Sequence, residues 1–77
     1  MKYHNGQEAK IGDKVRLGQD RDGVVVASFD TGEYSAGYRK AEWAYLGQGV
    51  MINFPMYGLI HYEKPEIDLE LIERAST

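Results

Sequence analysis

The residues best suited to chemistry lie two positions apart, at His61 and Glu63. On a β-strand, side chains two positions apart point to the same face, so an imidazole and a carboxylate would lie side by side. Such a pair can bind a metal ion or act as an acid–base pair. A metal site needs three or four ligands, and only His4 and scattered carboxylates could complete this one. The sequence therefore favours a surface or partly buried histidine beside a solvated glutamate, and we expect no metal and no cofactor.

Neither the serines nor the glycines form a catalytic motif. Ser28 and Ser35 lack the Gly-x-Ser-x-Gly pattern of a nucleophile elbow, and Ser76 lies near the end of the chain. The glycines are scattered as turn residues, and the one close pair, at residues 47–49, precedes a strand rather than a helix, so it cannot cradle a phosphate. We therefore predict no catalytic residue and favour a non-enzymatic protein.

Aromatic side chains are the more promising set. One interpretation places Trp43 and Tyr62 in the core, with Tyr34, Tyr38 and Tyr45 covering its edge, because a thin core needs large side chains. The other interpretation is an exposed binding surface, and both can hold because tyrosine is apolar and polar at once. The candidate binding residues are Tyr34, Tyr38, Trp43, Tyr45, His61 and Tyr62.

The charge distribution argues against nucleic acid as the main partner. Residues 1–40 carry a net charge of +1 and residues 41–77 carry −4, which would repel phosphate. Arg39 and Lys40, beside Tyr38, could contact phosphate, but acidic residues at positions 20–33 weaken the local field. A solvated surface of mixed sign is the favoured account.

The elements that would position these side chains are short strands. Residues 49–63 read as a hairpin, since apolar residues alternate on both sides of a Pro-x-x-Gly turn. Residues 39–46 have the composition of a short helix ended by Gly47, with Trp43 and Leu46 facing the sheet. The other predicted elements are strands at residues 11–17, 24–29 and 67–72, a polar loop at 18–23 and a turn at 30–33, with an edge hairpin or loose arm at 1–10 and a frayed tail at 74–77.

These elements predict an all-β domain of about five strands with one helical turn near residues 40–46. The spacing fits a small, strongly bent antiparallel barrel, and the alternative is an open meander with the helical turn packed on one face. Seventy-seven residues make one domain with a thin core. Cysteine is absent, so no disulfide can stabilise it, and self-association is the open route. If Met51 and Ile72 face outward, they would form an apolar patch that supports a homo-dimer or larger homo-oligomer.

The sequence also bears on location. The first ten residues lack the apolar region of a signal peptide. The longest unbroken apolar run, residues 24–27, is far too short to cross a membrane. We therefore expect a cytoplasmic protein with no membrane partner.

Two glycine-containing motifs resemble those of known barrels. Gly12-Asp13-x-Val15-x-Leu17 and Gly23-x-Val25 resemble the opening of SH3-like barrels, including the KOW-type and Tudor-like branches. The resemblance covers about fifteen residues and implies a fold more than a function. In such barrels, aromatic residues beside the long loop can line a groove for a peptide, a methylated side chain or a base. A longer pattern, from Trp43-x-Tyr45-Leu46 to residues 58–62, resembles a small bacterial family of unassigned function.

A distant resemblance is to the plasmid- and integron-borne, trimethoprim-insensitive dihydrofolate reductases, which are tetramers of SH3-like barrels with a shared central pore. Residues 12–16 resemble their first strand. Their pore motif Val-Gln-Ile-Tyr aligns with residues 59–62, where only Tyr62 matches, and Leu17 replaces a lysine. The groups that would hold folate and cofactor are thus missing.

Three functions follow from these expectations. The favoured one is a non-enzymatic module that binds a protein or peptide through the aromatic loop at residues 34–45, and also through the acidic last strand. An alternative is a homo-oligomeric enzyme with a shared-pore site around His61, Tyr62 and Glu63. A further alternative is KOW-like nucleic-acid binding.

Overall fold

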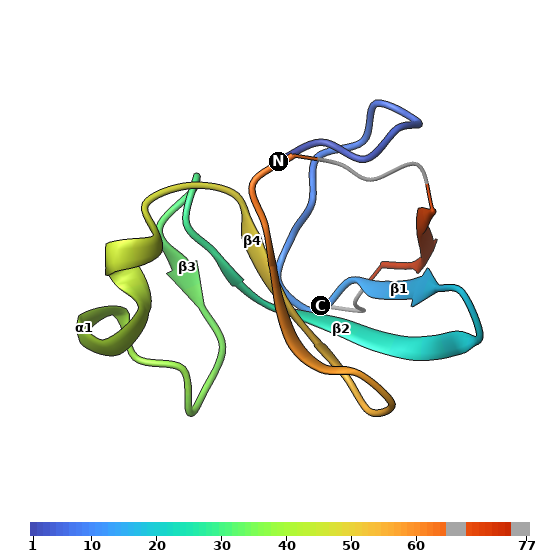
Figure 1. Cartoon of the computed structure of the whole chain (residues 1–77). Coiled ribbons are helices and arrows are strands. Elements are labelled where there is room, and N and C mark those ends of the chain that lie inside the picture. The colour runs from blue at the N-terminus through green and yellow to red at the C-terminus, as the bar shows by residue number, and fades with distance from the viewer. Residues whose placement is uncertain (65–67, 75–77) are drawn as a thin grey trace.

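The chain folds into an antiparallel β-sheet with a short helical segment at one side (Figure 1). The computed structural model describes residues 1–64 and 68–74. Within these residues the strands run in the order β5-β4-β2-β1-β6, and β3 pairs with β2 away from this path. The elements are β1 (Lys14–Leu17), β2 (Asp20–Ser28), β3 (Glu33–Tyr34), α1 (Lys40–Trp43), a 3-10 helix (Ala44–Leu46), β4 (Val50–Phe54), β5 (Gly58–Tyr62) and β6 (Leu69–Glu73). The all-β class is therefore confirmed.

The β4–β5 hairpin has the register that the alternating pattern predicts. Val50 pairs with Tyr62, Ile52 with Ile60, and Phe54 with Gly58. Gly58 has a φ of +85°, in the left-handed region that glycine adopts most easily, so it closes the turn. The helical segment at residues 40–46 is also confirmed, as one α-helical turn followed by a 3-10 turn.

Strand boundaries differ from expectation at three places. The predicted polar loop at residues 18–23 is wrong in part, because β2 already begins at Asp20 and pairs with Leu17 across a tight turn. The strand expected from residue 11 starts only at Lys14, because Gly12 turns the chain with a φ of +86°. A sixth strand, β3, forms where a turn and irregular chain were expected, since Tyr34 pairs with Ala27. The expected strand start at Ile67 and the tail at residues 75–77 lie outside the described residues.

The main core lies on the concave face of the sheet. Val15, Val25, Ile52 and Phe54 are fully buried there, and Tyr62 joins them from β5. The N-terminal residues contribute too: an isolated bridge between residues 2 and 8 closes a small turn that inserts Met1, Tyr3 and Ala9 into this core. Leu69 of β6 is buried in the same cluster and Leu71 packs against it, which confirms the predicted inward face of the last strand.

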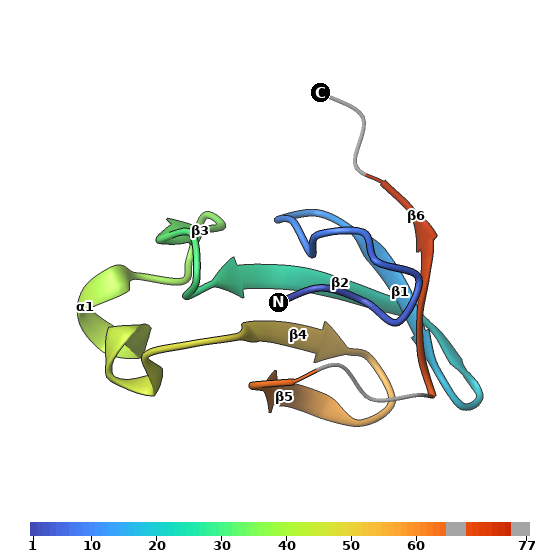
Figure 2. The ribbon, with the colours of Figure 1, turned by 90° about the horizontal axis from the view of Figure 1, so that it is seen from above.

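A second apolar cluster lies on the opposite face of the sheet. Val26, Ala27 and Met51 form its buried centre. The expectation that Met51 faces outward as part of an apolar surface patch is wrong, since only 2% of this residue is exposed. Alternation does place it on the outer face, but the segment that carries β3 and α1 covers that face. Figure 2 shows this segment wrapping past one end of β2 and β4. Ile72, the other residue of the expected patch, is 47% exposed.

Within the described residues, no helix is long and apolar enough to cross a membrane.

Candidate functional site

The segment between β2 and β4 anchors itself to the outer face of the sheet by aromatic side chains. Tyr34, Tyr38 and Trp43 are half-buried against the second cluster, together with Leu46. Tyr34 is fixed further by the pairing of β3 with β2, and the Tyr38 amide donates to the Ser35 carbonyl at 3.0 Å. The expectation that Trp43 and Leu46 face the sheet together is confirmed. These side chains hold a two-turn helical segment whose other face is open to solvent.

Tyr45 is the aromatic residue of this segment that does not pack on the sheet. It lies on the 3-10 helix between Trp43 and Leu46, and 78% of it is exposed. Of the predicted binding residues, it alone presents most of its ring to solvent.

His61 joins the same surface through Phe29. The His61 ring meets Phe29 edge-to-face, with centroids 5.4 Å apart, and Phe29 meets Tyr34 at 5.9 Å. The imidazole Nε2 lies 2.7 Å from the Gln48 carbonyl oxygen. A carbonyl can only accept, so Nε2 carries the proton and donates. His61 thus connects β5 to the loop that leads into β4.

Tyr62 lies on the other face of the sheet, in the main core. The structure therefore groups Tyr34, Tyr38, Trp43, Tyr45 and His61 on one side and separates Tyr62 from them. Successive residues of a strand point to opposite faces, which explains the separation. We call the grouped five residues the aromatic surface.

The side chains of His61 and Glu63 both contact the loop that leads into β4. The Glu63 carboxylate accepts from the Gln48 side-chain amide at 3.3 Å, while His61 binds the Gln48 carbonyl. Both groups thus hold one residue of the β4 approach. Across residues 1–64 and 68–74, no cluster of three or more histidine, cysteine, aspartate or glutamate residues could hold a metal ion.

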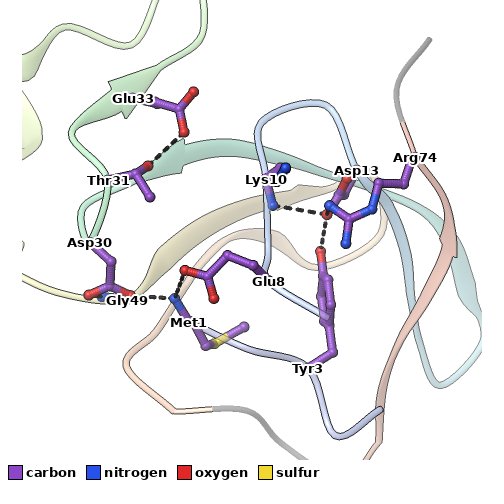
Figure 3. A network of polar contacts seen from close by, with 10 residues as sticks. All are labelled: Met1, Tyr3, Glu8, Lys10, Asp13, Asp30, Thr31, Glu33, Gly49 and Arg74. Carbon is purple, nitrogen blue, oxygen red and sulfur yellow. Dashed lines mark hydrogen bonds and ion pairs between the residues drawn. The ribbon is translucent and has the colours of Figure 1, made fainter. Parts of the chain in front are cut away.

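A polar network ties the chain terminus to the turn that follows β2 and to the approach to β4 (Figure 3). The Met1 ammonium donates to the Asp30 carboxylate, and Glu8 lies 3.9 Å from the same nitrogen. Asp30 also accepts from the Gly49 amide at 3.1 Å. These contacts, the ammonium bond first and the Gly49 amide second, lower the pKa of Asp30. The network fixes the turn that precedes β3.

A second polar cluster lies around the buried Asp13 carboxylate. One of its oxygens, Oδ2, accepts from the Tyr3 hydroxyl at 2.7 Å and from the Lys10 amide at 2.9 Å, and the Arg74 guanidinium lies 3.6 Å away. Burial and then the hydrogen bond to Asp13 raise the pKa of Tyr3. These residues hold the N-terminal turn and the end of β6 against β1, so their role is structural.

Sequence reasoning did not select a hollow that lies beside the last strand. It measures about 470 Å³ and lies between the β1–β2 turn, the β4–β5 turn and β6. Tyr57, 47% exposed, forms one wall, and Leu17 forms another. Tyr57 is not among the predicted binding residues, because its position in a turn gave no sign that a distant strand would lie beside it.

No protein-family model, curated protein or solved structure matches this chain. The class of protein that can be stated is a small antiparallel β-domain whose outer face is covered by an aromatic helical segment.

Proposed function

We propose that this protein is an SH3-like barrel that acts as a non-enzymatic interaction module and binds a protein or peptide through its aromatic surface. The observation that carries this proposal is the exposed ring of Tyr45 on an anchored segment.

The strand order supports the barrel. In the order β5-β4-β2-β1-β6, the first strand lies between the second and the last, so the chain curls back on itself. The register shifts within each of three strand pairings: β1 with β2, β1 with β6, and β2 with β4. Such irregularities bend strands, as a small barrel requires. The β3–α1 segment is then an insertion in the connection between the second and third barrel strands.

The anchoring of the segment supports binding. A partner that covers Tyr45 gains a large apolar area, and little conformational freedom is lost because Trp43 and Leu46 already hold the segment in place. Rigid tyrosine and tryptophan side chains on a supported surface are the residues that most often dominate binding energy. Charged residues of both signs, Arg39, Lys40 and Glu42, are exposed on the same segment and would form a polar rim.

The aromatic surface is better supported than a shared-pore enzyme. A site around His61, Tyr62 and Glu63 would need these side chains at one surface, whereas Tyr62 lies in the core and the other two hold Gln48. The single match to the reductase pore motif, Tyr62, therefore has no matching arrangement of groups around it.

Paired affinity captures would test the proposal. We expect Tyr45→Ala to remove specific partners from a capture in extracts of the source cells, with an unchanged melting temperature because the ring is exposed. Tyr57→Ala is the matched control, since it removes an exposed aromatic ring from the β4–β5 turn instead. Each captured partner would then be purified and titrated against the three proteins.

Binding that falls at least tenfold with Tyr45→Ala and is unchanged with Tyr57→Ala would support the aromatic surface. If every partner binds the Tyr45→Ala protein as tightly as the unchanged chain, the aromatic surface is not the binding site. A partner lost only with Tyr57→Ala would move the site to the hollow beside that residue.

A further inference from the structure

The last strand forms one edge of the sheet. Within the described residues β6 pairs only with β1, so its other side has no strand partner (Figure 2). An unpaired edge presents backbone N–H and C=O groups that can accept a further strand. Proteins use such edges to bind extended peptide segments by strand addition.

The side chains of this edge are acidic. Asp68, Glu70 and Glu73 are all exposed along it. Glu70 forms an ion pair with Arg16 of β1 at 2.7 Å. Asp68 and Glu73 form no ion pair among the described residues, so negative charge is left over at the edge.

The adjacent strand, β1, carries the opposite charge. Lys14 of β1 pairs in register with Glu73, and Arg16 pairs with Glu70. A basic strand therefore already lies on one side of β6. Cross-strand pairs of opposite charge stabilise a sheet, whereas like charges destabilise it. A strand added on the open side of β6 would need basic side chains to match Asp68 and Glu73.

This charge pattern excludes a second copy of the chain as the preferred occupant. Two β6 edges that paired with each other would bring Asp68, Glu70 and Glu73 of both copies together. Charges on an edge strand commonly prevent such pairing. The same charges select a cationic strand.

The surface around β6 leaves room for side chains of an added strand. The hollow of about 470 Å³ lies at the start of β6 and contains Asp68, Glu70 and the Tyr57 ring. A hollow of about 300 Å³ separates Leu69, Glu70 and Leu71 from the turn at residues 3–5. Arg16 also lines the hollow of about 470 Å³ and already pairs with Glu70, so a lysine or arginine side chain there would meet the Asp68 carboxylate and the Tyr57 ring, both of which attract cations.

We propose that β6 binds an extended, lysine- or arginine-rich segment of a partner protein as an additional strand. This site is separate from the aromatic surface and does not depend on it. It assigns a function to the acidic C-terminal part of the chain that neither the core nor the aromatic surface requires.

The test uses a short peptide of alternating lysine and valine, with glutamate in place of lysine in a control peptide. A third peptide keeps the lysines but carries N-methyl groups on its central amides, which removes the backbone donors. Fluorescence anisotropy measures affinity, and amide NMR shifts of the full chain locate the site. The protein variants are Asp68→Lys/Glu73→Lys and, as a control with the same change in net charge, Thr31→Lys/Glu33→Lys/Ala36→Lys at exposed positions around β3, which lies on the opposite side from β6 (Figure 2).

We expect the lysine peptide to bind and to shift the amides of residues 68–73. Replacing its lysines by glutamate, methylating its amides, or introducing Asp68→Lys/Glu73→Lys should each weaken binding at least tenfold. The control variant should retain most of the affinity. No binding of the lysine peptide, equal binding of the methylated peptide, or shifts confined to other strands would overturn the proposal. A dimer in sedimentation that the β6 variant dissociates would assign the edge to a second copy and overturn it as well.

Discussion

The carboxylate of Asp20 accepts a hydrogen bond from the backbone amide of Met56, with 2.8 Å between Oδ2 and the nitrogen. Asp20 begins β2, and Met56 lies in the turn between β4 and β5, so the contact joins the tips of two hairpins that are far apart in sequence. The other carboxylate oxygen accepts from the Asp22 amide at 2.9 Å. With 2% of the residue exposed, Asp20 acts as a buried acceptor for the β4–β5 turn and for the start of β2.

Replacing Asp20 by alanine should destabilise the fold by about 2–3 kcal/mol, because the Met56 amide loses a charged acceptor in a partly buried place. Urea unfolding followed by circular dichroism would measure this. Asp22→Ala is the control, since the Asp22 side chain is exposed, and should change stability by less than about 0.5 kcal/mol. Equal effects of the two variants would contradict the role assigned to Asp20.

Replacing Gly49 by alanine should be among the most damaging changes in the chain. Gly49 has a φ of +84°, and a Cβ there would lie 1.9 Å from the Tyr62 carbonyl oxygen. We expect a loss of at least about 3 kcal/mol. Gly47→Ala is the matched control: φ is +78° but nothing lies within 4 Å of its Cβ, so strain alone should cost about 1–2 kcal/mol. A larger loss for Gly47→Ala would show that the close approach to β5 is absent.

The ion pair between Asp30 and the Met1 ammonium should make the free energy of unfolding depend on pH in the acid range. The ammonium of Met1 lowers the pKa of Asp30 in the folded state, so the pair stabilises the fold above the ordinary carboxyl pKa of about 3.9. This stabilisation is lost as the pH falls through the lower, folded-state pKa. Asp30→Asn keeps an oxygen for the Gly49 amide and should cost about 0.5–1 kcal/mol near pH 7. The difference from the unchanged protein should vanish in strong acid, and a gap that stays constant would exclude the charge as its cause.

The buried Tyr3 hydroxyl should make the free energy of unfolding fall at alkaline pH. Burial and the adjacent Asp13 raise the pKa of Tyr3 in the folded state. The neutral phenol therefore stabilises the fold fully below the unfolded-state pKa of about 10, and this contribution is lost as the pH rises beyond it. Tyr3→Phe should cost about 1–2 kcal/mol at neutral pH through the lost hydrogen bond. Its stability should fall less steeply above pH 10 than that of the unchanged chain; parallel slopes would contradict this.

Alanine substitutions of Trp43 and Tyr45 should differ in their effect on stability, because only Trp43 packs on the sheet. Trp43 is half-buried on the second cluster, so Trp43→Ala should destabilise the fold by about 2 kcal/mol and increase hydrogen exchange in residues 40–46. Tyr45→Ala should leave both quantities unchanged because its ring packs on nothing beneath it. Thermal unfolding and amide hydrogen exchange would measure both variants. A loss of stability for Tyr45→Ala comparable to that for Trp43→Ala would show that the Tyr45 ring packs on the domain.

Local patterns determined much of the architecture. The alternation of residues 50–54, the Pro-x-x-Gly turn and the second apolar run identify the β4–β5 hairpin, since each is a property of neighbouring residues. Composition and Gly47 likewise located the helical turn. Five of the strands and this turn could be placed from sequence because period and turn chemistry act over a few residues.

The burial of particular side chains depends instead on contacts between residues that are far apart in the sequence. Met51 alternates as an outward residue, and only the folded β3–α1 segment buries it. Asp20 reads as part of a polar loop, and only the Met56 amide, brought close by the sheet, makes it a buried acceptor. Tyr34, Tyr45 and His61 share a surface while Tyr62 does not, because the β3–α1 segment packs on one face of the sheet and Tyr62 points to the other. Sequence thus determined the five longer strands and the helical turn, whereas tertiary structure formed β3 and decided which faces the elements bury, because pairing and burial depend on what packs against a segment from elsewhere in the chain.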